Sequence, residues 1–116
     1  MQWRWRVFLV NLDPVIGSEQ GRTRPALVIS EDEVNRALPV VSVLPITSRK
    51  SGRNLYPNEV LLPAGMAGLD RDSIVLCHQI RTVDRQRLVR RLGTLSDTNL
   101  QEQIVEALCF QLGIAI

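Results

Sequence analysis

The chain has 116 residues, 45% of them hydrophobic, and a formal net charge of +2. At this length we expect residues 1–116 to form a single domain that needs no disulfide or metal for its stability. The small net charge excludes a general polycation. No apolar run approaches the ~20 residues that a membrane-spanning helix requires, and the apolar run near the N-terminus is too short for a secretory signal. The composition therefore predicts a soluble, cytoplasmic protein with no membrane association.

The cationic residues are unusual in kind, because Lys50 is the one lysine among fourteen Lys and Arg residues. Arginine offers a planar set of donors that matches phosphates and base edges, although a coding bias explains the total equally well. Cys77 and Cys109 have no CxxC partner and lie in apolar runs. We expect both to be buried free thiols in a reducing compartment.

Several short strands are predicted in the first half of the chain. Residues 7–13 and 25–30 are short runs rich in strand formers, and residues 40–46 resemble a buried strand. Pro45 near the end of the third run indicates a sheet edge or a bulge. Residues 31–37 fit one turn of helix or a loop.

The second half predicts further strands and one helix. Residues 59–62 form a short strand, residues 73–77 and 80–83 form two strands or one bent strand, and residues 85–95 add a strand with an exposed basic face. Apolar residues then recur at helical spacing, and Thr98 is expected to cap this helix with Gln101 as its capping-box partner. The pattern predicts a mainly β fold: a small, curled, barrel-like antiparallel sheet with a C-terminal helix.

Two polar loops stand out between the strands. The first, "GSEQGRTRP" at residues 17–25, is longer than a turn between two strands needs. The second, "TSRKSGRNLYP" at residues 47–57, is basic. Either loop can be a mobile, solvated connection, or it can reach over a substrate and become ordered on binding.

Three sequence blocks in order resemble MazF/PemK-type toxins of toxin–antitoxin modules. They are "VFLVNLDPVIGSEQGRTRPALVIS", "VLPITS" and "LDRDSIVLCHQIRTVDRQRL", and together they span nearly the whole chain. One departure lies before the first strand, where the family commonly has an Arg-Gly-acid triplet. This chain has Arg4, Trp5 and Arg6 there, so the local backbone and a dimer contact are open to change.

The resemblance implies an SH3-like barrel with a terminal helix, of the fold shared by PemK and CcdB toxins, that works as a homodimer. It also implies a sequence-specific endoribonuclease that cuts single-stranded RNA without a metal and is held inactive by a cognate MazE-like antitoxin. The catalytic arginine of the family falls on Arg24 and its catalytic threonine on Thr47. The Gly-x-Glu-Gln loop of the family falls on residues 17–20.

The residues themselves suit RNA cleavage without a cofactor. RNA carries its own nucleophile, the 2′-hydroxyl, so an enzyme needs to remove its proton, offset charge on the phosphate and protonate the leaving oxygen. The sequence has one histidine and no HxxE or CxxC cluster, so we expect no metal site. The predicted products are a 2′,3′-cyclic phosphate and a 5′-hydroxyl, and DNA should not be cut.

The proposed catalytic roles follow from side-chain chemistry. Pro25 favours an extended backbone at Arg24, whose guanidinium would stabilise the charge of the transition state. Without the resemblance, a solvated arginine at a strand start is the commoner case. The Thr47 hydroxyl can bond a phosphate oxygen. Glu19 and His78 are alternative acceptors for the 2′ proton, and a histidine in an apolar strand is more often structural.

The remaining candidate residues are predicted to bind RNA. Ser18 and Gln20 can read base edges, and Arg22 can hold a phosphate. The set is completed by Ser48, Arg49, Lys50 and Arg53 of the second loop and by Gln79. We expect the arginines at 85, 87, 90 and 91 to form a solvated face, and Trp3 and Trp5 to serve in packing or an interface.

Two other functions remain open at this stage. One is a CcdB-like toxin that binds a protein target such as DNA gyrase, with the C-terminal helix as its working surface. The other is a non-catalytic binding module, since barrels of this type often only bind.

Overall fold

In the computed structural model, which describes residues 2–115, seven strands form antiparallel pairs in the order β4-β5-β3-β2-β1-β7, and β6 also pairs with β3. The strands are β1 (Arg6–Asn11), β2 (Thr23–Val28), β3 (Val40–Ser48), β4 (Glu59–Leu62), β5 (Ser73–Leu76), β6 (Arg81–Asp84) and β7 (Leu88–Thr94). The helices are α1 (Asp32–Ala37) and α2 (Thr98–Leu112), with 3-10 turns η1 (Met66–Gly68), η2 (Cys77–Gln79) and η3 (Arg85–Arg87).

β3 is the central strand, because it is paired along both edges. Val43 pairs with Val28 of β2 on one edge and with Arg81 of β6 on the other. β5 continues the second edge opposite residues 46–48, so β5 and β6 follow one another along β3 with η2 between them. Of the two alternatives for residues 73–83, the structure therefore has two strands.

Pro45 lies at the interruption in that second edge. Neighbouring residues of a strand direct their backbone groups to opposite edges. The carbonyl of Ser42 accepts the Ile29 N–H at 2.9 Å on the β2 side, so the backbone nitrogen of Pro45 faces the η2 side. Its missing N–H thus falls where the second edge of β3 has no ladder partner, which is the edge-type position that the sequence offered as one of two alternatives.

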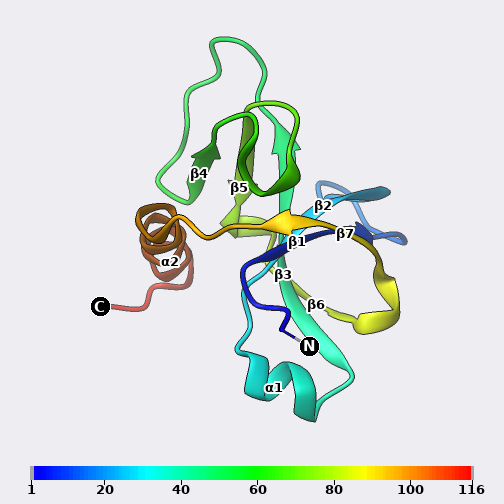
Figure 1. Ribbon diagram of the computed structural model, residues 1–116. Helices are drawn as coiled ribbons and strands as arrows, with labels where there is room; N and C mark the ends of the chain where they lie inside the picture. Colours follow the sequence, from blue (N-terminus) through cyan, green and yellow to red (C-terminus); the bar gives the residue numbers. More distant parts are fainter. Residues whose placement is uncertain (1, 116) are drawn as a thin grey trace.

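The two faces of the curled sheet cover separate cores. Leu27, Leu44 and Ile46 contribute to a core with β4, β5 and the buried side of α2. Ala26 and Val28 alternate with them and pack into a second core with β1 and β6. Figure 1 shows α2 beside β4, while the loop between β1 and β2 lies at the far side of the sheet.

The predicted antiparallel sheet with a C-terminal helix is confirmed. The sheet curls, but its pairing does not close into a ring, because β4 and β7 end the order of strands within the described chain. Of the two alternatives for residues 31–37, the structure has a helix, α1 (Asp32–Ala37), with Glu31 as its N-cap. Within residues 2–115, no helix is long and apolar enough to cross a membrane.

The cap of α2 differs from the prediction by one residue. Asp97 is the N-cap, and its carboxylate accepts the Leu100 N–H at 3.0 Å. Thr98 is the first helical residue, and Gln101 donates to the Leu95 carbonyl at 2.8 Å instead of returning to the cap. Asp97 satisfies a free N–H of the first turn and also carries the negative charge that a helix N-terminus favours.

The prediction that both cysteines are buried is wrong for one of them. Cys77 is fully buried, and burial raises the pKa of its thiol to about 12. Cys109 on α2 is only half-buried, because helical periodicity turns it partly out of the core. Both thiols are free.

Trp5 occupies a left-handed backbone conformation with φ of 67°. This region favours glycine, so the tryptophan is held there at a cost of roughly 1–2 kcal/mol. Its N–H donates to Val28 and its carbonyl accepts from Leu95, at 2.9 and 2.7 Å. The ring packs against the first core, and the Arg4 guanidinium lies 4.8 Å from its centroid. Trp5 therefore serves in packing.

A buried ion pair anchors the loop between β3 and β4. The side chain of Glu59 is fully buried and binds Arg53 through two contacts, of 2.6 and 3.1 Å. Burial opposes ionisation of Glu59, but the hydrogen bonds from Arg53 and the Tyr56 N–H, with the charges of Arg53 and His78, lower its pKa overall. Glu59 is therefore a charged residue inside the protein.

We predict that Arg53→Ala lowers the free energy of unfolding at pH 7 by more than the control variant below does, because it removes the charged partner of the buried Glu59 carboxylate and leaves it the Tyr56 N–H as donor. Urea denaturation measures this change. Since the pKa of Glu59 is lowered by folding, the pair stabilises the protein above the ordinary glutamate range, and this contribution is lost as pH falls through the folded-state pKa.

The matched control is Glu31→Gln, which removes the partner of Arg4 in an ion pair whose Glu31 side chain is 68% exposed. We expect a change below about 1 kcal/mol there. Equal losses in the two variants would contradict the anchoring role of Glu59.

Candidate active site

Arg24 and Thr47 lie two residues beyond the last paired residues of β2 and β3. The two strands pair through Leu27 with Leu44 and Ala26 with Pro45, after which Arg24 pairs with Val10 of β1 and Thr47 with Ile74 of β5. Residues two apart on a strand share a face. Arg24 is thus in phase with Ala26, and Thr47 with Pro45. Both side chains extend from the same face of the sheet, just beyond the last paired residues.

The guanidinium of Arg24 is held by the first loop. Its Nε donates to the Gly21 carbonyl at 2.8 Å, and its Nη1 donates to the side-chain oxygen of Gln20. Both partners are neutral, so the positive charge of Arg24 is not cancelled. Because a guanidinium has five N–H donors, donors remain for an incoming phosphate.

A pocket of about 300 Å³ lies between the first loop, the Pro45 region of β3 and the η2 turn. Its lining consists of Ser18, Glu19, Gln20, Pro45, His78, Gln79, Ile80 and Arg81. Five of these were predicted site residues, although they come from segments about sixty residues apart. Arg24 adjoins the pocket through Gln20, and Thr47 adjoins it through Pro45.

Gln79 fastens the loop over this pocket. Its side-chain oxygen accepts the Gln20 N–H at 3.1 Å, and its side-chain nitrogen donates to the Ser18 carbonyl at 3.3 Å. Gln79 was predicted to bind RNA, and the structure gives it this positioning contact. One amide thus determines how the loop sits above the η2 turn.

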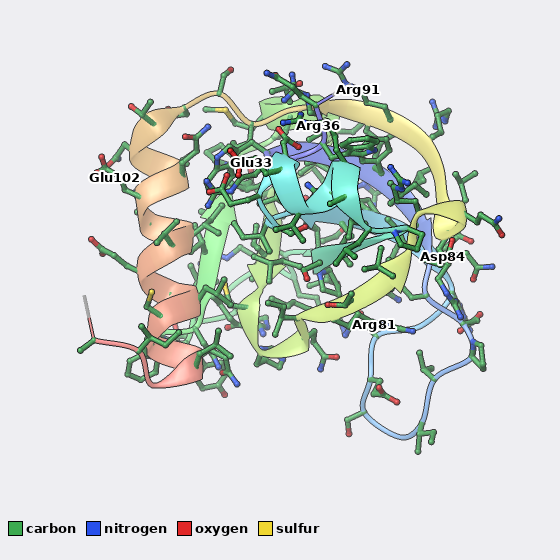
Figure 2. The ribbon with its side chains drawn as sticks, turned by 90° about the horizontal axis from the view of Figure 1, so that it is seen from below. Glu33, Arg36, Arg81, Asp84, Arg91 and Glu102 are labelled. Carbon is green, nitrogen blue, oxygen red and sulfur yellow. The ribbon has the colours of Figure 1, made fainter. Side chains whose placement is uncertain are left out.

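Arg81 is a site residue that the sequence reasoning missed. It pairs with Val43, so it lies on the same face as Arg24 and Thr47. Its Nη1 donates to the Leu12 carbonyl at 2.6 Å, and Figure 2 shows it extending from β6 toward the segment that joins β1 to β2. The sequence held a signal for this placement, because Arg81 lies two residues before the buried Val83 and so faces the same side of the strand.

The neck of the first loop is tightly built. Asp13 accepts the Arg22 N–H at 2.7 Å, and the Leu12 N–H donates to the Arg22 carbonyl at 2.9 Å. Arg87 donates to the carbonyls of Asn11 and Asp13. The expectation that Arg87 belongs to a solvated face is wrong, because η3 brings it to this neck. Arg85 is also half-buried, 5.1 Å from the Trp3 ring.

The neck also explains a glycine. A Cβ at Gly21 would lie 2.7 Å from the Asp13 carboxylate and 2.8 Å from the Val15 side chain. A larger residue therefore requires the side chains of Asp13 and Val15 to move aside. Arg22 next to it has a positive φ of 64°, so its backbone serves the neck while its side chain remains exposed.

Glu19 and His78 both remain candidate proton acceptors. Both are exposed and line the same pocket. One oxygen of Glu19 accepts the Ile16 N–H at 2.7 Å, which holds the carboxylate within the loop and leaves its second oxygen for another partner. The geometry brings both groups to the site without choosing between them.

The second loop divides its basic residues between two roles. Arg49 donates to the Arg53 carbonyl at 3.0 and 3.3 Å, and Arg53 is engaged with Glu59. Ser48 and Lys50 are exposed at the end of β3. RNA binding by this loop remains a prediction, and the guanidinium of Arg53 already has a structural partner. Within residues 2–115, no three His, Cys, Asp or Glu side chains form a group that could hold a metal ion.

Known proteins resemble this chain along most of its length. A family model for the PemK-like, MazF-like toxin of type II toxin–antitoxin systems matches residues 3–112. The chain is 40% identical to Endoribonuclease EndoA of Bacillus subtilis over 111 residues, which cover 96% of this chain and 94% of that protein.

Solved structures extend the likeness to three dimensions. MazF of Deinococcus radiodurans superimposes with a TM-score of 0.80 at 32% identity, covering 96% of each chain. A MazE–MazF crystal structure from the same organism matches with a TM-score of 0.73 at 32% identity, covering 96% of this chain and 95% of that one. The chain therefore belongs to the PemK-like, MazF-like toxin family of type II toxin–antitoxin systems.

Proposed function

We propose that this protein is a toxin that cuts single-stranded RNA at specific sequences by attack of the RNA's own 2′-hydroxyl. The identity to EndoA and the toxin family support an endoribonuclease. The proposal for the chemistry is supported by the phase of the strands, which turns Arg24 and Thr47 to one face just beyond the Ala26–Pro45 pair, and by the neighbouring pocket that Glu19 and His78 line.

The reaction needs no nucleophile from the protein. Glu19 or His78 takes the proton of the 2′-hydroxyl, whose oxygen then bonds to phosphorus. Arg24 and the Thr47 hydroxyl stabilise the negative charge that develops on the phosphate oxygens. The bond to the 5′-oxygen breaks, and that oxygen takes a proton from water, which gives a 2′,3′-cyclic phosphate and a 5′-hydroxyl. The steps use protein side chains and no metal.

The proposal includes partners. The Deinococcus complex contains a MazE with its MazF, which supports a cognate MazE-like antitoxin for this chain. We expect the antitoxin to cover the groove that holds Arg24 and Thr47. We also expect the toxin to act as a homodimer, as its family resemblance implies.

We predict that Arg24→Ala lowers the cleavage rate at least about 10³-fold and Thr47→Ala about 10²-fold, because each removes a donor from the transition state. A long single-stranded RNA, incubated with purified protein in excess chelator, is the substrate. Fragments with cyclic phosphate ends are expected, and a 2′-deoxy residue at the cut should block cleavage there.

Arg90→Ala is the control, since Arg90 is exposed on β7 and should leave the rate unchanged. If Arg24→Ala cuts within about twofold of wild type, the site assignment is wrong. Wild-type protein that leaves RNA intact but inhibits DNA gyrase would establish the CcdB-like function instead.

A second prediction separates the two proton acceptors. Glu19→Gln and His78→Asn each keep a polar side chain of similar size but cannot take the proton equally well. The variant that lacks the general base should have a single-turnover rate about 10²-fold or more below wild type, and the rate of the other variant should fall less than about tenfold. Rates that fall only slightly in both variants would exclude both residues as the base.

A third prediction concerns the neck of the loop. Gly21→Ala forces a displacement from Asp13 and Val15, which moves the carbonyl that holds Arg24. We expect cleavage to fall about tenfold or more while the urea midpoint changes little, because the loop lies outside both cores. Gly113→Ala is the control, with a positive φ and open space around it. Equal activity of wild type and Gly21→Ala would mean that the neck does not position Arg24.

A further inference from the structure

A second pocket shares a wall with the candidate active site. It has a volume of about 420 Å³ and is lined by Arg53, Tyr56, Pro57, Asn58, Glu59, His78 and Phe110. His78 also lines the first pocket. A chain of nucleotides that passes through the first pocket can therefore place its next base in the second, which has the size of a ligand site.

Three aromatic side chains from different elements meet around this pocket. Tyr56 comes from the loop between β3 and β4, His78 from η2 and Phe110 from the last turns of α2. Tyr56 is 67% exposed and Phe110 is 64% exposed, although side chains of this type are usually inside a protein. Aromatic rings presented to solvent around a hollow are the arrangement by which proteins stack unpaired bases.

The ring of Tyr56 stands on a rigid support. Its backbone N–H donates to the buried carboxylate of Glu59 at 2.9 Å, and Arg53 lies 5.9 Å from the ring centroid. Asn58 donates to the Gln111 side-chain oxygen at 2.9 Å, which ties the loop to the end of α2 near Phe110. Because Glu59 is neutralised by Arg53, its charge does not repel an RNA strand.

We propose that this pocket, which we call the aromatic pocket, binds one base of the RNA next to the cleaved phosphate and thereby contributes to sequence selection. This inference rests on the proposed function of the neighbouring site. The base stacks on Tyr56 or Phe110, and its strand continues past His78 to Arg24 and Thr47.

The test measures each protein variant on RNAs that lack a single base. A cleavage site is first mapped on a long RNA, and short RNAs spanning it are made with one abasic residue at each position in turn. We expect Tyr56→Ala and Phe110→Ala to lower kcat/KM on the intact RNA about tenfold, the effect of losing one stacked base. At one position beside the cut, the abasic residue should cost wild type about tenfold and the alanine variants less than about twofold.

The controls separate stacking from folding. Tyr56→Phe retains the ring and should keep kcat/KM within about twofold, and so should Val89→Ala, which truncates an apolar residue 61% exposed on β7. Thermal unfolding should be unchanged in all variants, since both rings lie at the surface. Alanine variants that cut as fast as wild type would overturn the proposal. So would a result in which, at every position, the abasic residue lowers kcat/KM by the same factor in the alanine variants as in wild type.

Two further outcomes are decisive. If the alanine variants lower the sedimentation coefficient and higher protein concentration restores cleavage, the aromatic pocket is an interface between copies and the proposal is wrong. If wild type cuts no RNA, the proposed function fails, and the affinity for 2′-O-methyl RNA then tests the pocket alone. About tenfold weaker binding of the alanine variants would support it, and equal or absent binding would overturn it.

Discussion

The pairing of β3 on both edges is the constraint on which the site depends. One edge holds β2, and its register turns Arg24 and Thr47 to the same face, each two residues beyond the last β2–β3 pair. The other edge holds β5 and β6, whose interruption at η2 presents His78 and Gln79 beside Pro45. A slip of one residue in either ladder would turn these side chains to the opposite face. The two cores that the faces cover therefore maintain the chemistry as well as the fold.

Most of the fold was predictable from the sequence, because strand and helix periods leave a local pattern. The runs at residues 40–46 and 59–62 matched β3 and β4 closely. The contacts of individual arginines were not predictable, since they depend on which carbonyls and carboxylates the fold brings near. Arg87 was read as solvated and instead closes the neck of the loop, and Arg81 was overlooked. Five of the residues that the family motif marked line one pocket, and no periodicity would have brought them together, because they come from segments about sixty residues apart.

The departure at Trp5 illustrates a conflict between local preference and packing. A left-handed φ at a bulky residue is unfavourable by itself. Here the backbone joins the start of β1 to both Val28 and Leu95, and the indole fills space against the first core. The backbone conformation thus suits glycine, which the family commonly has at this place, while the packing contacts belong to tryptophan. The left-handed backbone at Trp5 could therefore not be predicted from the conformational preference of tryptophan.

The partners of the arginines explain how a chain of net charge +2 can present a cationic site. Among residues 2–115, Arg4 and Arg53 have carboxylate partners, so their charges are cancelled locally. Arg24, Arg81 and Arg87 instead donate to neutral oxygens of the backbone or of Gln20. These bonds fix the position of each guanidinium and leave its charge intact. All three guanidinium groups donate to the first loop or its neck, which also carry the carboxylates of Asp13 and Glu19. The local balance of charge is therefore positive although the net charge of the chain is small.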